Sequence, residues 1–298
     1  MIASITITYR PDISALRQQF ESLRGQVDGM WVIDNGSSEP TLELLRNLCR
    51  EFKAELQTLG YNSGIAHAQN VGIAAARNKD AAHILLMDQD SEATTDMVPT
   101  LARALEAAPN AAAAGPSSID QRTGKRSFFV LDNGLWPLQW APADAASHPP
   151  LPVGFLIASG TLMRCAALMD ATPMRADWFI DHVDSEWCLR TRAQGWTLLG
   201  VPSAVLRHRL GDKVSRIWFL RWRQVAHHSA LRDYYMFRNS VLLARQTYVP
   251  MRWKLFFLSR LVQFAGFFLV FVGQRRNRFA MMARGLCDGL RGRTGPWR

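Results

Sequence analysis

Two carboxylates follow the apolar run 84–87, at Asp88 and Asp90. Residues i and i+2 of an extended chain lie on one side of it, so these acids would repel each other unless a cation lay beside them. Mg²⁺ and Mn²⁺ prefer oxygen ligands and leave coordination positions for phosphate oxygens. An acidic helix start is the alternative, because Asp and Ser are common there. The spacing therefore favours a divalent-metal site that binds a diphosphate.

Other sites with comparable residues fit this sequence poorly. It contains neither GxGxxG after the first strand-like segment nor GxxxxGK[ST], which argues against a dinucleotide fold or a P-loop. A calcium loop opening at Asp88 would need glycine at Ala93 and glutamate at Pro99. The four cysteines form no CxxC pair, which argues against zinc and disulfide frameworks and fits a reducing cytoplasm. The first residues lack a basic segment followed by a long apolar core, so we expect no secretory signal.

The elements that must position the acids alternate between strand and helix patterns. Such repetition predicts an α/β fold with a parallel, doubly wound sheet, in which ligands bind beyond the carboxyl ends of the strands. Tyr9, Asp34, Asn62 and Asp88 lie at or just after such ends. The expected strands are 2–9, 30–34, 55–59 and 83–87, and the expected helices include 39–52 and 94–108.

The middle of the chain has weaker patterns. Residues 116–152 are rich in Pro, Ala, Gly and Asp and indicate an irregular connection, and 153–164 return to strand character with a Ser-Gly break. The segment 177–196 predicts a helix that begins at Asp181 and ends at Gly195.

Charge divides the chain into two parts. Residues 207–298 hold 19 Lys and Arg against 3 Asp and Glu, whereas 1–206 hold 16 against 22. We expect a catalytic domain at 1–206 and a basic, aromatic, helical region at 207–298 that meets an anionic surface. Basic residues interleaved with aromatic ones can also bind single-stranded nucleic acid, but such a protein has no need of a long apolar segment.

The apolar segment 255–273 has nearly the length of a membrane span, which needs about 20 residues. Arg260 and Gln263 interrupt it, and basic residues flank it on both sides. A central Arg costs about 2.5–3.5 kcal/mol on insertion scales, so the pattern favours a helix that lies in the membrane interface. We expect peripheral attachment to the cytoplasmic face of the cell membrane; a buried helix of a C-terminal subdomain is the alternative.

Five segments of the chain have a distinctive order and spacing: TYRP (8–11), VIDNGS (32–37), NSGIAHAQNVGI (62–73), LLMDQDS (85–91) and WFIDHVDSEWCLR (178–190). Together they resemble the family 2 glycosyltransferases, and within them the bacterial rhamnosyltransferases of O-antigen and related polysaccharide assembly. Two further segments, HRLGD (208–212) and YYMFRNS (234–240), extend the likeness to that subgroup.

The resemblance implies a glycosyltransferase A-type (GT-A) fold and a role for each matched position. Asn62, Gly64 and Asn70 stand at a loop-to-helix junction, where free backbone N–H groups would favour the diphosphate, and an ordinary helix start is the alternative. Asp34 has a turn-forming alternative, His208 that of an exposed loop histidine, and Gly160 that of a β-bulge. The implied donor-binding residues are Thr8, Tyr9, Asp34, Asn62, Gly64, Asn70, Asp88 and Gln89. The implied metal ligands are Asp88, Asp90 and His208, and the acceptor-binding residues are Gly160, Asp181 and Trp187.

Three acids compete for the role of catalytic base. Asp181 stands where a helix begins, so its default role is an N-cap, and Glu186 precedes Arg190 by four residues and favours a surface pair. The family pattern aligns its catalytic carboxylate with Asp184, although Val183 replaces the usual preceding Glu. We expect the helix start to lower the pKa of Asp184, which would leave it ionised but weakly basic.

The implied reaction is a single inverting displacement. A carboxylate base would deprotonate an acceptor hydroxyl while Mg²⁺ or Mn²⁺ stabilised the departing nucleoside diphosphate. The expected donor is thymidine-diphosphate L-rhamnose, and the expected acceptor is a growing saccharide on a polyprenyl diphosphate, with no nucleic-acid partner. A transferase of the same fold with another nucleotide sugar is the alternative, and a non-enzymatic membrane- or nucleic-acid-binding protein is a more distant one.

Overall fold

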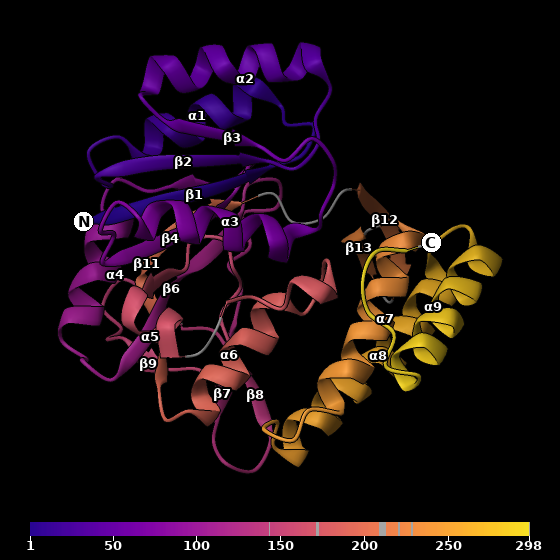
Figure 1. Ribbon diagram of the computed structural model, residues 1–298. Coiled ribbons are helices and arrows are strands. Elements are labelled where there is room, and N and C mark those ends of the chain that lie inside the picture. Colours follow the sequence, from indigo (N-terminus) through magenta and orange to yellow (C-terminus); the bar gives the residue numbers. More distant parts are fainter. Residues whose placement is uncertain (143, 171–172, 209–212, 220, 228, 298) are drawn as a thin grey trace.

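The computed structural model describes residues 1–298 apart from 143, 171–172, 209–212, 220, 228 and 298 (Figure 1). Four residues of the segment 208–212 that extends the family likeness thus lie outside the described residues. A mixed central sheet carries the site, with helices on both of its faces and a group of C-terminal helices beside it.

The sheet has the order β3-β2-β1-β4-β10-β6-β11-β5, and a short strand, β9, pairs with β11. The first four strands of this order are parallel, as predicted for the whole sheet. In the other half β10 is antiparallel to both neighbours, so the sheet is mixed. The bounds are β1 Ile2–Thr8, β2 Gly29–Asp34, β3 Glu55–Thr58, β4 His83–Asp88, β5 Glu92–Ala93, β6 Ala111–Asp120, β9 Leu151–Pro152, β10 Leu162–Arg164 and β11 Thr197–His208.

Alternation along the strands divides the core between the two faces of the sheet. Ile5 and Ile33 pack with α3 on one face, whereas Val32 packs with α1 and α2 on the other. Branched apolar residues at every second position suit a sheet buried on both sides. The helices of this part are α1 Ile13–Leu23, α2 Glu39–Phe52, α3 Ile65–Arg77, α4 Met97–Glu106, α5 Cys165–Asp170 and α6 Val183–Ala193.

Strand register brings the predicted strand ends to one edge of the sheet. Thr8 pairs with Asp34, Asp34 with Thr58, and Ile7 with Asp88. The residues that follow these positions therefore emerge together, as the sequence patterns predicted.

The expectation for the middle of the chain was wrong. Strand β6 runs through Asp120, and β7 (Phe129–Asp132) and β8 (Pro137–Trp140) form a hairpin within the stretch expected to be irregular. Within 153–164 only the last three residues form the strand β10. Alanine and proline obscured β6 because its stability comes from pairing with β10 and β11, which no local pattern reports.

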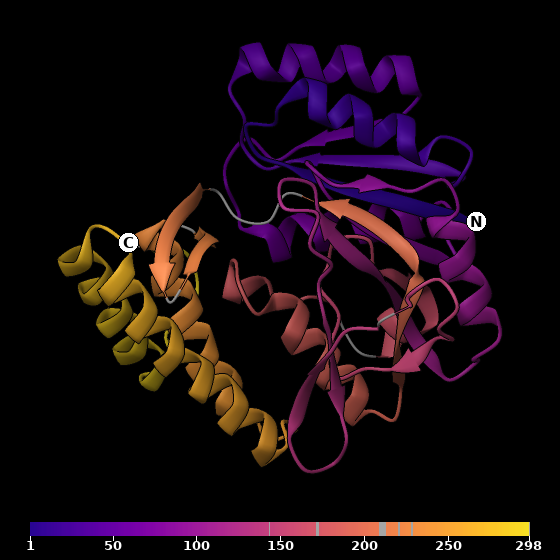
Figure 2. The ribbon, with the colours of Figure 1, turned by 180° about the vertical axis from the view of Figure 1, so that it is seen from behind.

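The C-terminal region contains a hairpin and three helices, grouped on one side of the molecule (Figures 1 and 2). Leu243 of α7 and Trp253 of α8 share a hydrophobic cluster with Ile5 and Ile33 of the sheet, so this region packs on the main body. Strand β11 continues two residues beyond the predicted boundary at 206, and the division into two domains stays a prediction. The elements are β12 Lys213–Phe219, β13 Arg221–His227, α7 Ala230–Ala244, α8 Met251–Phe271 and α9 Arg275–Leu290.

Candidate active site

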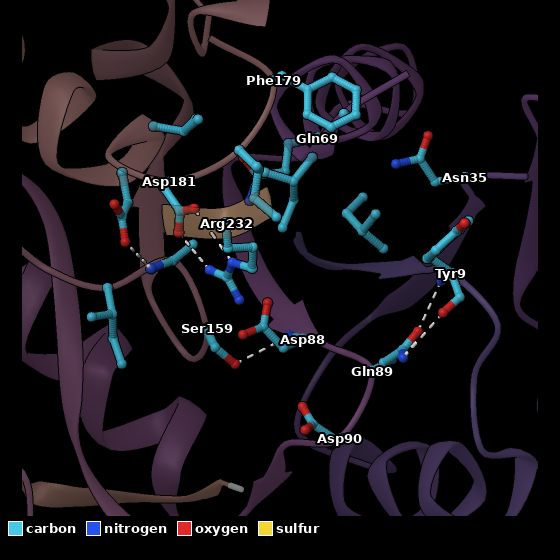
Figure 3. Close-up of a pocket in the computed structure, with 18 of the residues that line it drawn as sticks. Tyr9, Asn35, Gln69, Asp88, Gln89, Asp90, Ser159, Phe179, Asp181 and Arg232 are labelled. Atoms are coloured by element: carbon cyan, nitrogen blue, oxygen red, sulfur yellow. Dashed lines mark hydrogen bonds and ion pairs between the residues drawn. The ribbon is translucent and has the colours of Figure 1, made fainter. Parts of the chain in front are cut away.

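A cavity of about 1130 Å³ opens where the carboxyl ends of β1 and β4 meet the start of α6 (Figure 3). Side chains or backbone of nine predicted site residues line it: Tyr9, Asn62, Gly64, Asp88, Gln89, Asp90, Asp181, Asp184 and His208. Five predicted residues do not: Thr8, Asp34, Asn70, Gly160 and Trp187.

Asp88, Asp90 and His208 form an acidic cluster on one wall of this cavity. Their ligand atoms all lie within 4.8 Å of one another. His208 Nδ1 lies 3.5 Å from Asp90 Oδ1, and its Nε2 lies 4.0 Å from Asp88 Oδ2. Ser91 Oγ orients the imidazole through a 2.7 Å hydrogen bond with Nδ1. Two carboxylates and an imidazole are a donor set that accepts Mg²⁺ or Mn²⁺.

The electrostatics of the cluster favour a cation. Burial raises the pKa of Asp88, and the carboxylate of Asp90 raises it further, while His208 and Arg232 oppose both effects. A carboxylate whose charged form is disfavoured in this way is stabilised when a cation binds beside it. The donor set and the charge balance therefore both fit a divalent ion.

Gln89 joins the acidic cluster to the end of β1. Its Oε1 accepts from the Tyr9 N–H at 2.9 Å, and its Nε2 donates to the Tyr9 carbonyl at 3.4 Å (Figure 3). The Gln89 amide is thus bonded to backbone, and Tyr9 keeps an exposed ring at the cavity edge.

Asp34 organises a turn, the alternative that the sequence left open. It is fully buried, and its carboxylate accepts from the N–H groups of Gly36 and Ser37, the Ser37 hydroxyl and the Thr8 hydroxyl. With four protein donors on two oxygens, Asp34 offers no contact to a base or ribose in this structure. Thr8 is likewise buried, and its hydroxyl donates to Asp34.

The start of α3 differs from the predicted anion site. Three consecutive N–H groups expected to be free have protein acceptors: Ser63 donates to Asn35 (2.8 Å), Gly64 to Asn62 (3.1 Å) and Ile65 to the Phe179 carbonyl (2.7 Å). Gly64 has φ +87°, and a Cβ there would lie 2.7 Å from the Phe179 carbonyl oxygen. The glycine therefore permits close packing of two loops.

The remaining three predicted residues have packing roles. Asn70 exchanges two 2.8 Å hydrogen bonds with the Met174 backbone, which ties α3 to the segment before α6. Gly160 has φ +80°, and its neighbour Ser159 reaches the cavity instead, where its Oγ accepts from the Asp88 N–H at 3.1 Å. Trp187 is 1% exposed and lies in the core, because its side of α6 faces the sheet.

Asp184 lies in the first turn of α6 and faces the cavity. Burial, helped by the carboxylates of Asp181 and Asp88, raises its pKa to about 6, against hydrogen bonds from the N–H groups of Ser185 and Ala158. The expected lowering by the helix start is therefore wrong, since loss of solvation outweighs the helix dipole here. Asp184 is a stronger base than predicted, and it remains ionised at pH 7.

Asp181 does not cap α6 as expected. His182 occupies the N-cap position, and Asp181 has φ +63° and directs its carboxylate at Arg232. The Arg232 guanidinium lies 2.5 Å (Nη2) and 3.3 Å (Nε) from the two oxygens (Figure 3). Arg232 belongs to α7, and the sequence analysis missed it because no local pattern links α7 to the cavity.

Glu186 forms the predicted pair with Arg190, but in the interior. It is fully buried, accepts 2.8 and 2.9 Å hydrogen bonds from Arg190 and also accepts from the Tyr248 hydroxyl. It does not line the cavity, which leaves Asp184 and Asp181 as the candidate bases. Asn35 and Gln69 also line the cavity without having been predicted, although Asn35 stands inside the quoted segment 32–37.

A match to a known family covers most of the residues that line this cavity. The model of the family described as Glycosyl transferase family 2 matches residues 4–170, which include most of β1, all of β4 and both acids of the cluster. The chain belongs to this family. It is a glycosyltransferase that acts with a nucleotide sugar, as the resemblance implied.

One sequence relative matches this family 2 glycosyltransferase over its whole length, and several solved structures share its fold. The chain is 29% identical to the dTDP-rhamnosyl transferase RfbF of Shigella flexneri over 304 residues, which cover 100% of this chain and 98% of that protein. It superposes on residues 1–349 of S. aureus TarS in complex with UDP-GlcNAc with a TM-score of 0.61, 14% identity, and coverage of 97% of this chain and 80% of that one. For GalNAc-T7 with UDP, GalNAc and Mn²⁺ the TM-score is 0.56 at 12% identity, over 70% of this chain and 43% of that one. The structures establish the GT-A fold.

Proposed function

We propose that this protein transfers L-rhamnose from a thymidine-diphosphate donor to a saccharide hydroxyl, with inversion at the anomeric carbon. The likeness to a dTDP-rhamnosyl transferase along the whole chain supports the sugar. The observation that carries the reaction class is structural: a partly buried base, Asp184, shares one cavity with the acidic cluster Asp88, Asp90 and His208.

These residues have different roles in a single displacement reaction. Asp184 accepts the proton of the acceptor hydroxyl, and its raised pKa brings its basicity nearer to the operating pH. Asp88, Asp90 and His208 would hold Mg²⁺ or Mn²⁺, which would supply positive charge to the departing diphosphate. Arg232 adds a second positive charge in the cavity. One displacement inverts configuration, so a β-linked donor gives an α-rhamnoside.

A donor screen tests this proposal. The purified protein is incubated with dTDP-rhamnose, UDP-glucose, UDP-galactose and UDP-GlcNAc, each with Mg²⁺, with Mn²⁺ or with excess chelator, and nucleotide release and transfer are measured. We expect the fastest turnover with dTDP-rhamnose and a metal. Faster turnover of another sugar nucleotide would reject rhamnose alone, and full activity in chelator would reject the metal.

The same proposal includes a membrane-bound acceptor and peripheral attachment to the cytoplasmic face. Among the described residues, α8 is the one helix long and apolar enough to cross a membrane, and only 22% of its most apolar stretch is buried. Leu255, Leu258 and Val262 form an exposed stripe at i, i+3 and i+7. Trp136, at the tip of the β7–β8 hairpin, packs against Phe256 of the same helix with ring centroids 6.1 Å apart.

Charge at both ends of α8 favours a lipid surface over a further protein helix. Lys254 precedes the stripe and Arg275 and Arg276 follow it, and each basic residue near anionic lipid contributes about 1 kcal/mol. Helix α8 also keeps Trp253 and Phe257 buried against the main body, a contact that a spanning helix would give up. A helix that lies in the membrane interface can place its apolar stripe in lipid and keep its other face against the main body.

Vesicle flotation tests the attachment. We expect the protein to float with vesicles of phosphatidylglycerol and phosphatidylethanolamine, and to be released by high salt or alkaline carbonate. The double variant Leu255→Ser, Val262→Ser should float less, whereas Leu44→Ser, an equally exposed leucine on α2, should not differ from wild type. Retention through both salt and carbonate would indicate a span instead, and equal flotation of all variants would reject α8 as the contact.

A further inference from the structure

The segment 178–182, which leads into the catalytic helix, has an unusual backbone. Phe179, Asp181 and His182 have φ values of +68°, +63° and +60°, and none is glycine. All three line the cavity. Each such conformation costs about 1–3 kcal/mol and persists only where surrounding contacts enforce it.

Asn239 of α7 supplies the central contact. Its Nδ2 donates to the carbonyls of Trp178 (3.0 Å), Ile180 (2.7 Å) and Asp181 (2.9 Å), so two amide protons serve three acceptors. The side chain is fully buried, and its Oδ1 accepts from Arg238 Nε at 2.9 Å. This last bond fixes the amide so that only its donors face the segment.

The residues on either side of Asn239 hold the same segment. Arg238 is fully buried, and its Nη2 donates to the Trp178 carbonyl at 2.9 Å. Ser240 Oγ lies 2.8 Å from His182 Nε2. Burial lowers the pKa of His182 to about 4, so this imidazole is neutral at pH 7.

The held segment positions the candidate base. The His182 carbonyl accepts the first helical hydrogen bond of α6, from the Glu186 N–H at 2.9 Å, so its orientation sets where Asp184 enters the cavity. The Phe179 carbonyl accepts from the Ile65 N–H at the start of α3. The segment thus connects the base to the helix beside the opposite wall of the cavity.

We infer that Arg238, Asn239 and Ser240, here called the α7 clamp, are positioning residues for the transfer reaction: they hold 178–182 so that Asp184 meets the acceptor hydroxyl. The inference rests on the proposed function in taking Asp184 as the base. It assigns a reaction role to the C-terminal region that is separate from membrane contact. Misplacement of a reacting group by about 1 Å can cost about 10²-fold in rate.

The test compares clamp variants with a control on the same helix. Asn239→Ala removes three donors to the segment, and Ser240→Ala removes the contact to His182. Val241→Ala truncates a buried side chain of α7 on the side of the helix that packs against Gly289 of α9. Turnover, dTDP affinity, Tm and hydrogen exchange of residues 178–186 are measured on the full chain.

We expect Asn239→Ala to lower kcat about 10²-fold and Ser240→Ala less, with dTDP binding retained and faster exchange in 178–186. Val241→Ala should lower Tm and leave kcat and that exchange near wild type. Ser240→Ala decides the matter if Asn239→Ala does not fold. Clamp variants with the kcat and exchange of the control would overturn the inference.

The experiments can reject the proposed function and the role of the α7 clamp independently of each other. Asp184→Asn is measured beside these variants, and loss of turnover there with normal turnover in the clamp variants would reject the clamp and keep the base. If the wild-type protein used no nucleotide sugar, the proposed function would fall, and the comparison of exchange in 178–186 would still decide whether the clamp holds the segment.

Discussion

Arg232 and Asp181 meet inside the cavity although 51 positions separate them along the chain. The guanidinium contacts both carboxylate oxygens, and its charge also lowers the pKa of Asp88. A cation of the C-terminal region thus stands between the predicted acceptor side and the acidic cluster. The C-terminal region is therefore part of the site.

Replacement of Arg232 should impair turnover. We expect Arg232→Ala to lower kcat/KM by about 10-fold or more, because a positive charge near the departing diphosphate is lost, and Arg232→Lys to recover part of it. Steady-state kinetics with the preferred donor measure both. Arg175→Ala is the matched control, since Arg175 pairs with Asp177 through two 2.9 Å bonds and does not line the cavity. Equal effects of the two alanine variants would contradict the prediction.

Asp184→Asn should separate activity from stability. We expect turnover to fall by about 10²-fold or more while dTDP binding persists, because the amide cannot accept the hydroxyl proton. The raised pKa means that the charged carboxylate destabilises the folded state at neutral pH, so the variant should have a higher Tm. Kinetics and thermal unfolding test the two parts. If Asp181→Asn abolished transfer and Asp184→Asn did not, the base would be Asp181.

The pH dependence of kcat/KM should report the same carboxyl. Asp184 must be ionised to act, so activity should rise through about pH 6 and level off above it. Burial and the neighbouring charges of Asp181 and Asp88 place this rise in activity well above the ordinary pKa range of an aspartate. A profile measured at constant metal concentration tests it. A limb near pH 4 would show that the carboxyl is solvated in the working enzyme.

The acidic cluster should govern metal dependence. We expect Asp90→Ala to raise the Mg²⁺ or Mn²⁺ concentration needed for half-maximal turnover, because one of two carboxylate ligands is lost. Titration of each metal into chelator-treated protein measures this shift. Asp96→Ala, on the same chain segment but outside the cavity, should behave as wild type. Unchanged metal dependence in Asp90→Ala would remove it from the ligand set.

Asp132 should be essential for stability rather than chemistry. Its buried carboxylate accepts from Arg252, Trp253 and Arg192, which ties the β7–β8 hairpin to α8 and α6. Although burial opposes ionisation, these bonds hold the pKa of Asp132 well below its usual range. Removing one partner of a buried ion pair costs about 3–5 kcal/mol, so Asp132→Ala should lower the free energy of unfolding by that order.

Urea denaturation at several pH values tests the contribution of Asp132. Because the folded-state pKa is depressed, the stabilisation is present above the unfolded-state pKa of about 4 and is lost as pH falls below it. The wild type and Asp132→Asn should therefore converge in acid. Glu51→Gln, which breaks an exposed pair with Arg17, should change stability much less, because solvent screens that pair. Equal losses of unfolding free energy at neutral pH in Asp132→Asn and Glu51→Gln would contradict the prediction.

The sequence by itself determined the parts of the fold that depend on local periodicity. The helix predicted at 39–52 has those bounds, and the strands that end at Thr8, Asp34 and Asp88 follow their apolar runs. Parallel strands bring their carboxyl ends to one edge, so Asp88 and Asp90 could be placed from spacing alone. The family segments supplied His208 and Asp184, both of which line the cavity.

The tertiary structure alone decided how each side chain is used. Asp34 organises a turn, because Thr8 and the next turn supply donors to its carboxylate. Glu186 lies in the interior, where its carboxylate accepts from the Tyr248 hydroxyl. Desolvation raised the pKa of Asp184 where helix position alone predicted the opposite. Arg232 and Asn239 reach the catalytic segment from more than 50 residues away. Solvation and contacts between distant segments depend on the packed molecule, and a local pattern of residues contains neither.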